Sequence, residues 1–335
     1  MTKRALITGI TGQDGSYLAE LLIDKGYEVH GIVRQVALED PRHRMWRIRH
    51  LRDRVWLHAA SLENHASVLR VLREVKPDEV YHLASQSFVS YALEEELSTL
   101  HTNITSTHAI LSGFREACPN ARFYFAGSSE MFGRADRSPQ DEATPFHPRS
   151  AYGISKCTEC YLTRHYREAY GLFAAAGILF NHESPRRGFE FVTRKISSHV
   201  ALIAAGKAHM LKLGNLEAQR DWGHAKRYVE AIWRILQAER PDDFVVATGH
   251  THSVREFCEV AFGVAGLDYR EFVEFDPRLH RPAEAVLLVG DASKARRMLG
   301  WAYDIPFESL VKEMVESDME RVKDVEETRL LSGVE

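Results

Sequence analysis

The sequence predicts an α/β fold, in which a doubly wound parallel sheet with helices on both faces is followed by a smaller, discontinuous C-terminal domain. Three observations support this. Short apolar segments alternate with segments of helical periodicity up to residue 180, as in repeated strand–helix–strand units. A glycine-rich turn joins the first strand to the first helix, and beyond residue 180 the alternation loosens. A chain of 335 residues also corresponds to roughly two domains.

The first forty residues read as a strand–helix–strand unit. Residues 4–8 (RALIT) are apolar and followed by glycine, as a buried parallel strand would be. Residues 16–25 place leucines at helical spacing, and Gly26 ends this helix. Residues 27–33 (YEVHGIV) form the second strand.

The same pattern continues along the chain. Further strands are expected at residues 55–59, 79–84, 122–127 and 173–180, with helices at 65–74, 100–117 and 152–170. Later helices are expected near 192–205, 226–238, 254–265 and 307–325. The first domain therefore spans residues 1–180, completed by about 216–245. Residues 181–335 supply mainly the second domain, interleaved with the first.

Composition excludes several classes of protein. With 44% hydrophobic and 27% charged residues and a net charge of −4, the chain is neither disordered nor attracted as a whole to nucleic acid. The longest nearly apolar stretch, residues 171–180, is about half as long as a membrane-spanning helix. Four cysteines make no disulfide framework, and we expect no signal peptide before the first strand. We expect a cytoplasmic protein.

The glycine-rich turn predicts dinucleotide binding. Gly9, Gly12 and Gly15 stand between a strand and a helix, where glycine lets backbone N–H groups approach a pyrophosphate and the helix dipole favours the anion. This is the phosphate site of a Rossmann-type domain. Arg34 ends the second strand, where NAD sites carry a carboxylate and NADP sites use arginine for the 2′-phosphate. The expected cofactor is NADP.

Four polar residues form a candidate catalytic group. Tyr152 and Lys156 lie four residues apart on a helix, so the phenol and the ammonium share one face. A nearby cation favours the phenolate, which suits Tyr152 to acid/base work. Ser128 and Glu130 follow the strand at 122–127, at the sheet edge where open α/β folds bind ligands.

Other polar clusters have simpler interpretations. The basic run at 42–50 is interpreted as a helix near a phosphate or subunit contact, because no nucleic-acid motif accompanies it. Cys157 and Cys160 lie within a helix and are expected to be packed in the core. His250 and His252 lack a metal-binding motif, so we assign no metal.

Longer motifs narrow the identification. They are LITGITGQDG (6–15), ILFNHESPRRG (178–188), FVTRK (191–195), GNLEAQRDWG (214–223), YVEA (228–231) and RPAE (281–284). Together with Ser128, Tyr152 and Lys156, they resemble the GDP-mannose 4,6-dehydratase family of the extended short-chain dehydrogenase/reductases. The resemblance runs from residue 3 to about residue 320.

The resemblance implies a redox cycle without net redox. C4 of the hexose is oxidised with tightly held NADP, water is eliminated across C5 and C6, and the hydride returns to C6. Tyr152 would take the O4 proton, Lys156 would hold Tyr152 and the nicotinamide ribose, and Ser128 would bind O4. Glu130 would remove the C5 proton and help protonate the departing hydroxyl, which an epimerase or reductase does not need. Its alternative role is that of a solvated carboxylate at a helix entry.

The resemblance also implies the binding residues. The cofactor would contact Gly9, Thr11, Gly12, Gln13, Asp14, Gly15, Arg34, Ser61, Leu62, Leu83, Ser85, Tyr152, Lys156, His182 and Arg187. Arg187 matches a residue that reaches a neighbouring subunit's cofactor. The nucleotide-sugar would contact Gln86, Ser87, Asn181, Glu183, Val192, Lys195, Arg220, Arg281 and Glu284. Arg220 and Arg281 would bind the diphosphate, because planar guanidinium groups suit phosphate oxygens.

Two departures affect the cofactor side. Family members carry Arg-Arg-Ser-Ser after the second strand, which supports tetramers, whereas this chain has Arg34 followed by QVALED. Ser61 stands where an adenine-side Asp is usual. We expect a homodimer or homotetramer.

Three functional alternatives stay open. The substrate could be another GDP-sugar, such as a GDP-manno-heptose. A reductase step could follow dehydration. A non-enzymatic NADP sensor on the same fold is a more distant alternative, since a sensor needs no acid/base group.

Overall fold

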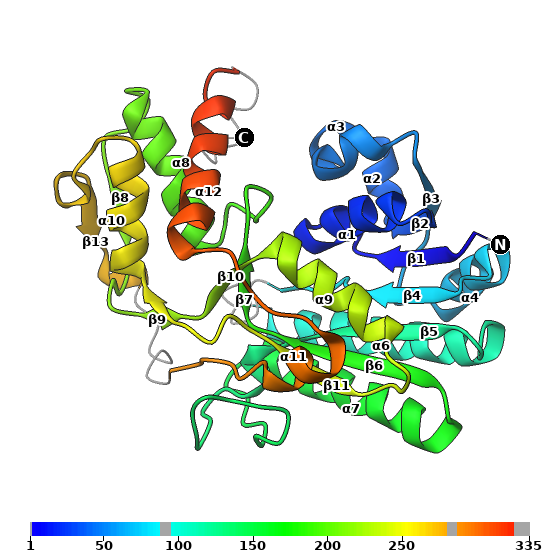
Figure 1. Ribbon diagram of the computed structural model, residues 1–335. Helices are drawn as coiled ribbons and strands as arrows, with labels where there is room; N and C mark the ends of the chain where they lie inside the picture. The colour runs from blue at the N-terminus through cyan, green and yellow to red at the C-terminus, as the bar shows by residue number, and fades with distance from the viewer. Residues whose placement is uncertain (1, 88–94, 280–286, 325–335) are drawn as a thin grey trace.

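Seven parallel strands form the central sheet, in the order β11-β6-β5-β4-β1-β2-β3 (Figure 1). The computed structural model describes residues 2–87, 95–279 and 287–324. The strands are β1 (Arg4–Thr8), β2 (Glu28–Val33), β3 (Val55–Ala59), β4 (Glu79–His82), β5 (Arg122–Ser128), β6 (Phe173–Leu179) and β11 (Asp243–Val246). The predicted doubly wound parallel sheet is confirmed, and the order reverses next to β1, where such folds bind ligands.

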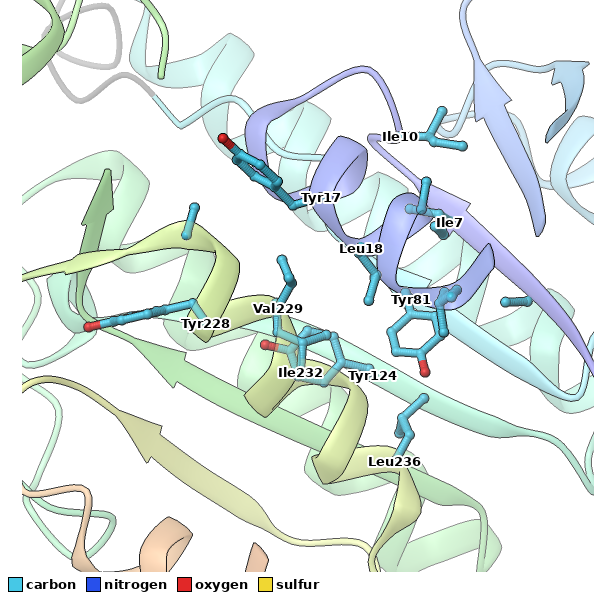
Figure 2. Close-up of a cluster of buried hydrophobic side chains, with 14 of the residues drawn as sticks. Ile7, Ile10, Tyr17, Leu18, Tyr81, Tyr124, Tyr228, Val229, Ile232 and Leu236 are labelled. Atoms are coloured by element: carbon cyan, nitrogen blue, oxygen red, sulfur yellow. The ribbon is translucent and has the colours of Figure 1, made fainter. Parts of the chain in front are cut away.

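Helices cover both faces of this sheet. One face packs against α1 (Gln13–Asp24), α9 (Ala225–Gln237) and α11 (Ser293–Leu299). Figure 2 shows part of this core, where Tyr17 and Leu18 of α1 lie near Val229 and Ile232 of α9. The other face packs against α4 (His65–Val75), α6 (Glu96–Ala117) and α7 (Ala151–Tyr170). Burial of apolar surface on both faces explains why the strands are apolar throughout.

The predicted single helix over residues 42–50 is wrong. Asp40 caps a short helix, α3 (Pro41–Arg44), which follows α2 (Gln35–Glu39), and a 3₁₀ helix, η1 (Trp46–Leu51), comes after it. The buried residues Met45, Ile48 and Leu51 recur every three positions. This spacing matches the three residues per turn of a 3₁₀ helix better than the 3.6 of an α-helix.

A second lobe is built mainly from later helices. It contains α8 (Val192–Ala204), α10 (Val254–Val264) and α12 (Phe307–Arg321), with β8 (Leu211–Leu213) paired to β13 (Val273–Phe275) (Figure 1). Arg194 of α8 and Asp318 of α12 form a fully buried ion pair at 2.6 Å. This pair fixes the two helices against each other, because removing one partner would leave a buried charge.

Short strands connect the two lobes. β7 (Asn181–Glu183) pairs in parallel with β10 (Trp222–His224), and β9 (Gln219–Arg220) pairs with β12 (His252–Ser253). The remaining elements are η2 (Ser129–Met131), η3 (Tyr269–Glu271) and η4 (Pro277–Leu279). The chain returns to the sheet through α9 and β11, whereas the domain boundary at residue 180 stays a prediction. Within the described ranges, no helix has the length and apolar character that crossing a bilayer requires.

Candidate functional site

A cavity of about 690 Å³ lies at the carboxyl edge of the sheet. Its walls come from the glycine turn after β1, the ends of β2, β4, β5 and β6, and the start of α7. Parallel strands place their carboxyl ends together, so residues far apart in sequence meet here.

Most of the predicted site residues line this cavity. They are Gly9, Thr11, Gly12, Gln13, Asp14, Gly15, Arg34, Ser61, Leu62, Leu83, Ser85, Gln86, Ser87, Ser128, Glu130, Tyr152, Lys156, Asn181, His182 and Arg187. Glu183, Val192, Lys195 and Arg220 are not among its lining residues. Arg281 and Glu284 lie outside the described residues.

Two glycines of the turn are required because other backbone segments of the chain approach them closely. Gly9 has φ of +75°, and a Cβ there would lie 2.9 Å from the Ala84 nitrogen. A Cβ on Gly15 would lie 2.2 Å from the Gly9 oxygen. Gly12 begins α1 without any side-chain cap, so the first N–H groups of the helix stay available to an anion. These features fit a dinucleotide pyrophosphate.

The start of α1 is tied to the segment around β7. Gln13 Nε2 donates to the His182 carbonyl at 3.0 Å, and Ser184 Oγ donates to Gln13 Oε1 at 2.8 Å. His182 Nε2 lies 2.8 Å from Asp14 Oδ2. Burial opposes both charges, but the mutual attraction of the pair lowers the pKa of Asp14 and raises the pKa of His182.

Basic side chains gather around Arg34. Arg34, Arg44 and His43 are exposed and line the cavity together with the half-buried Arg47. The Arg47 guanidinium donates to the Arg186 carbonyl at 2.7 Å, and burial lowers its pKa to about 10. Only Arg34 was predicted individually. The basic run at 42–50 was the available signal, and its interpretation as lying near a phosphate points to the same place.

The predicted catalytic residues meet at the start of α7. Ser150 caps this helix by accepting from the Gly153 N–H at 3.0 Å. A Cβ on Gly153 would lie 2.7 Å from the Glu130 oxygen, so glycine allows α7 to approach η2. Ser128 Oγ accepts from the Glu130 N–H at 3.2 Å. The hydroxyl, the carboxylate, the phenol and the ammonium therefore share one wall of the cavity.

Tyr152 and Lys156 are both buried. Lys156 Nζ lies 5.8 Å from the centre of the Tyr152 ring and 4.8 Å from that of Phe125. Burial raises the pKa of Tyr152, a hydrogen bond with Ser128 lowers it, and the charge of Glu130 raises it. Proton transfer at Tyr152 is thus sensitive to the charges around it.

Two buried polar atoms of residues that line the cavity have no hydrogen-bond partner among residues 2–87, 95–279 and 287–324. They are Ser85 Oγ and Gln86 Oε1. Asn103 fixes the Gln86 backbone, since its Oδ1 accepts from the Gln86 N–H at 2.8 Å. Buried polar atoms normally find partners, so these two fit hydrogen bonding to a bound cofactor or sugar.

The predicted nucleotide-sugar residues are more dispersed. Glu183 is buried, accepts from Thr193 Oγ1 at 2.5 Å and pairs with Arg187 Nε at 3.1 Å. Arg187 lines the cavity of its own chain, and its reach toward a neighbouring subunit stays a prediction. Lys195 Nζ donates to the Lys212 carbonyl at 2.7 Å.

Other predicted features have structural explanations. Cys157 and Cys160 are buried, and burial raises the pKa of each thiol to about 12. This confirms that they are packed in the core. Across the described ranges, no group of three or more His, Cys, Asp or Glu residues is arranged to hold a metal ion.

Comparison with known proteins identifies the family. The family model described as GDP-mannose 4,6 dehydratase matches residues 6–314. GDP-mannose 4,6 dehydratase 2 of Arabidopsis thaliana is 50% identical over 333 residues, covering 96% of this chain and 88% of that protein. GDP-mannose 4,6 dehydratase of Homo sapiens is 43% identical, covering 95% and 92%. The enzyme of Vibrio cholerae is 42% identical, covering 95% and 94%.

Solved structures establish the fold. The dTDP-glucose 4,6-dehydratase of Bacillus anthracis, in complex with NAD, has a TM-score of 0.83 at 18% identity, covering 96% of this chain and 98% of that chain. The protein named RMD from Pseudomonas aeruginosa, complexed with NADPH, has a TM-score of 0.81 at 22% identity, covering 96% and 100%.

Proposed function

The chain belongs to the GDP-mannose 4,6-dehydratase family, and from this premise we propose that it converts GDP-D-mannose to GDP-4-keto-6-deoxy-D-mannose. The observation that carries the proposal is the position of Glu130 beside Ser128 and Tyr152 at one cavity wall. An oxidoreductase acting on a hydroxyl needs the phenol and the lysine. A dehydratase also needs a carboxylate that can reach the neighbouring carbon.

The chemistry divides among the residues of that wall. Tyr152 takes the O4 proton, and Ser128 hydrogen-bonds O4. Once C4 is a ketone, the C5 proton is acidified, and Glu130 removes it and helps protonate the departing C6 hydroxyl. Lys156 holds Tyr152 and the nicotinamide ribose. General acid/base groups of this kind each contribute about 10²–10⁴ in rate.

The cofactor proposed is NADP. When bound, NADP supplies a hydride acceptor for C4 and a donor for C6. The glycine turn would hold its pyrophosphate, and Ser85 would hydrogen-bond near the nicotinamide. Arg34 and Arg44 would bind a 2′-phosphate, with His43 beside them, because guanidinium groups form strong hydrogen bonds to phosphate oxygens. Solved relatives of the same fold bind NAD or NADPH, which supports a nicotinamide cofactor.

The sugar nucleotide is proposed to extend from the catalytic wall toward the second lobe. Gln86, Ser87 and Asn181 line the cavity and would contact the sugar. Glu183, Val192 and Lys195 remain proposed contacts, as do Arg220 and Arg281 for the diphosphate and Glu284 for the guanosine.

Self-association is part of the proposal. Leu97 of α6 is 84% exposed, and Ile154, Tyr161 and Tyr170 of α7 are 46%, 56% and 45% exposed. Exposed apolar side chains on these two adjacent helices are the surface that we propose meets a second copy. We propose a homodimer or homotetramer, which light scattering of the purified protein would measure. All four cysteines are free, which supports a reducing, cytoplasmic location.

Proton NMR tests the function directly. GDP-mannose is incubated with the purified protein and NADP, without NADPH. A C6 methyl doublet beside a C4 ketone or its hydrate is the expected result, whereas absence of the methyl would contradict the substrate assignment. A panel containing a GDP-heptose would then identify the preferred GDP-sugar. A product reduced at C4 only when NADPH is added would identify a further reductase step.

A further inference from the structure

A buried carboxylate lies behind the catalytic lysine. Glu159 is one turn along α7 from Lys156, and its Oε2 lies 3.4 Å from Lys156 Nζ. The two side chains are 0% and 3% exposed. A buried ammonium is costly unless a counter-charge or hydrogen bonds compensate it. The sequence motifs assign Glu159 no role, yet it is the counter-charge that the lysine contacts.

A chain of buried hydrogen bonds leads from Glu159 back to the glycine turn. Thr107 Oγ1 of α6 donates to Glu159 Oε2 at 2.8 Å. His82 Nε2, at the end of β4, lies 2.9 Å from Thr107 Oγ1. His82 Nδ1 lies 2.8 Å from Thr8 Oγ1, and Thr8 directly precedes Gly9. The chain therefore joins β1, β4, α6 and α7.

The direction of every bond in this chain can be deduced. An ionised carboxylate only accepts, so the Thr107 hydroxyl proton is used toward Glu159. The Thr107 oxygen must then accept from His82 Nε2–H, which leaves Nδ1 to accept from the Thr8 hydroxyl. Burial and the charge of Lys156 lower the pKa of His82 to about 3, in keeping with a neutral ring. The Thr8 oxygen accepts from the Ala84 N–H at 3.1 Å.

We propose that Glu159 is a positioning residue for the reaction proposed above. It holds the Lys156 ammonium in one place and partly offsets its charge at Tyr152, while Thr107, His82 and Thr8 fix the carboxylate relative to the glycine turn. The inference rests on the proposed function only for the roles of Tyr152 and Lys156. The contacts themselves belong to the fold.

The charges facing Tyr152 define what removal of Glu159 would do. Glu130 acts on it from η2, Arg187 from the segment after β7, and Glu159 from its own helix, while Ser128 shares a hydrogen bond with the phenol. Glu159 raises the pKa of Tyr152. Neutralising Glu159 leaves the charge of Lys156 without its counter-charge, so the phenolate forms at lower pH.

The first test compares Glu159→Gln with the wild-type enzyme. We expect kcat to fall by roughly 10–100-fold with little change in KM, because the reacting groups lose alignment. In a plot of kcat against pH, the acidic limb should move to lower pH by about one unit. Glu168→Gln, on the exposed side of the same helix, also removes one negative charge. It should leave kcat and the position of the acidic limb unchanged. An acidic limb at the wild-type position would overturn the proposal.

A second variant covers the case in which Glu159→Gln does not fold. Glu159→Asp keeps the charge but shortens the side chain, so contact with Lys156 weakens. Its kcat should fall severalfold while the acidic limb stays at the wild-type pH. An unchanged kcat in a folded Glu159→Asp protein would also overturn the positioning role.

A readout without substrate separates this inference from the proposed function. In protein labelled with ¹³Cζ-tyrosine, the Tyr152 resonance is identified by its loss in Tyr152→Phe. Its titration midpoint should be lower in Glu159→Gln than in Glu168→Gln, whatever the sugar substrate is. If GDP-mannose is not turned over but the Tyr152 midpoint is lower in Glu159→Gln, only the proposed function is rejected. If the two variants have the same Tyr152 midpoint, the inference is rejected.

Discussion

The cofactor side and the sugar side of the cavity are built differently. On the cofactor side, the glycine turn and the catalytic groups are held by buried contacts from adjacent strand ends. On the sugar side, the predicted binding groups lie on several separate segments and contact their own chain. Lys195 donates to the Lys212 carbonyl, and Arg220 Nη1 donates to the Gln219 carbonyl at 2.8 Å. The cofactor side is thus organised in advance, whereas Lys195 and Arg220 would have to leave these contacts if they bind a sugar nucleotide as proposed.

The largest expected effect falls on the organised side. Tyr152→Phe removes the proposed proton acceptor for O4 and should lower kcat by about 10³-fold, while NADP affinity changes little because the glycine turn is untouched. Steady-state kinetics and calorimetric titration would measure the two quantities. Tyr161→Phe, on the same helix with a 56% exposed side chain, is the matched control. A Tyr152→Phe enzyme with wild-type kcat would show that the phenol is not the base.

The next effect tests the adenosine end of the same side. Arg34→Ala should weaken NADP binding by roughly 10–100-fold and leave NAD binding nearly unchanged, because only NADP carries the 2′-phosphate. Dissociation constants of both dinucleotides measure this difference. Arg52→Ala removes an exposed charge that does not line the cavity and should alter neither. An equal loss for NADP and NAD would refute 2′-phosphate recognition by Arg34.

A smaller effect is expected on the sugar side. Arg220→Ala should raise the KM for GDP-mannose by about 10-fold and leave NADP affinity unchanged, because we propose that the guanidinium leaves its own-chain contact to bind the diphosphate. Arg270→Ala, which breaks an exposed pair with Asp268 in the same lobe, is the control. If KM stays constant, Arg220 has no part in substrate binding.

The smallest effect concerns the contact between α1 and β7, where Asp14 meets His182. The Asp14–His182 pair has a lowered Asp14 pKa and a raised His182 pKa, against ordinary values of 3.8 and 6.5. The Asp14 contribution to stability is lost as pH falls through its folded pKa, and that of His182 is lost as pH rises through its own. The pair therefore stabilises the fold most between the two ordinary pKa values, 3.8 for Asp14 and 6.5 for His182.

Urea unfolding of Asp14→Asn measures that contribution. The free energy of unfolding of the wild-type protein should exceed that of the variant by about 1 kcal/mol near pH 5, and by less near pH 8.5. Asp24→Asn, near the end of the same helix with a 76% exposed side chain, should show no such pH dependence. A stability difference independent of pH would mean that the pair is not ionic.

Much of the cofactor side could be predicted from local sequence. The bounds of β1 and β3 agree with the prediction, because buried parallel strands are continuous apolar runs. α1 begins at Gln13 rather than at residue 16, since its first turn is polar and carries no apolar period. On the cofactor side, the sequence analysis named the basic run at 42–50 but did not identify His43 and Arg44 as residues of the site. Only the tertiary fold brings them to the cavity.

The sugar side was less predictable for physical reasons. β7, β9, β10 and β12 have only two or three residues each, too few for a period to show. Glu183 was predicted to contact the nucleotide-sugar, and this stays a prediction, whereas its ion pair with Arg187 was not foreseen. A motif identifies which residues matter, whereas the partners that a side chain meets depend on packing between segments distant in sequence.

The central claim, that one cavity wall oxidises C4, eliminates water and returns the same hydride to C6, can be tested with GDP-[4-²H]mannose. The purified protein and NADP are incubated with this substrate, and the product methyl group is examined by deuterium NMR and mass spectrometry. The account predicts that the deuterium appears in the C6 methyl group. A methyl group without deuterium, or no methyl group at all, would contradict it.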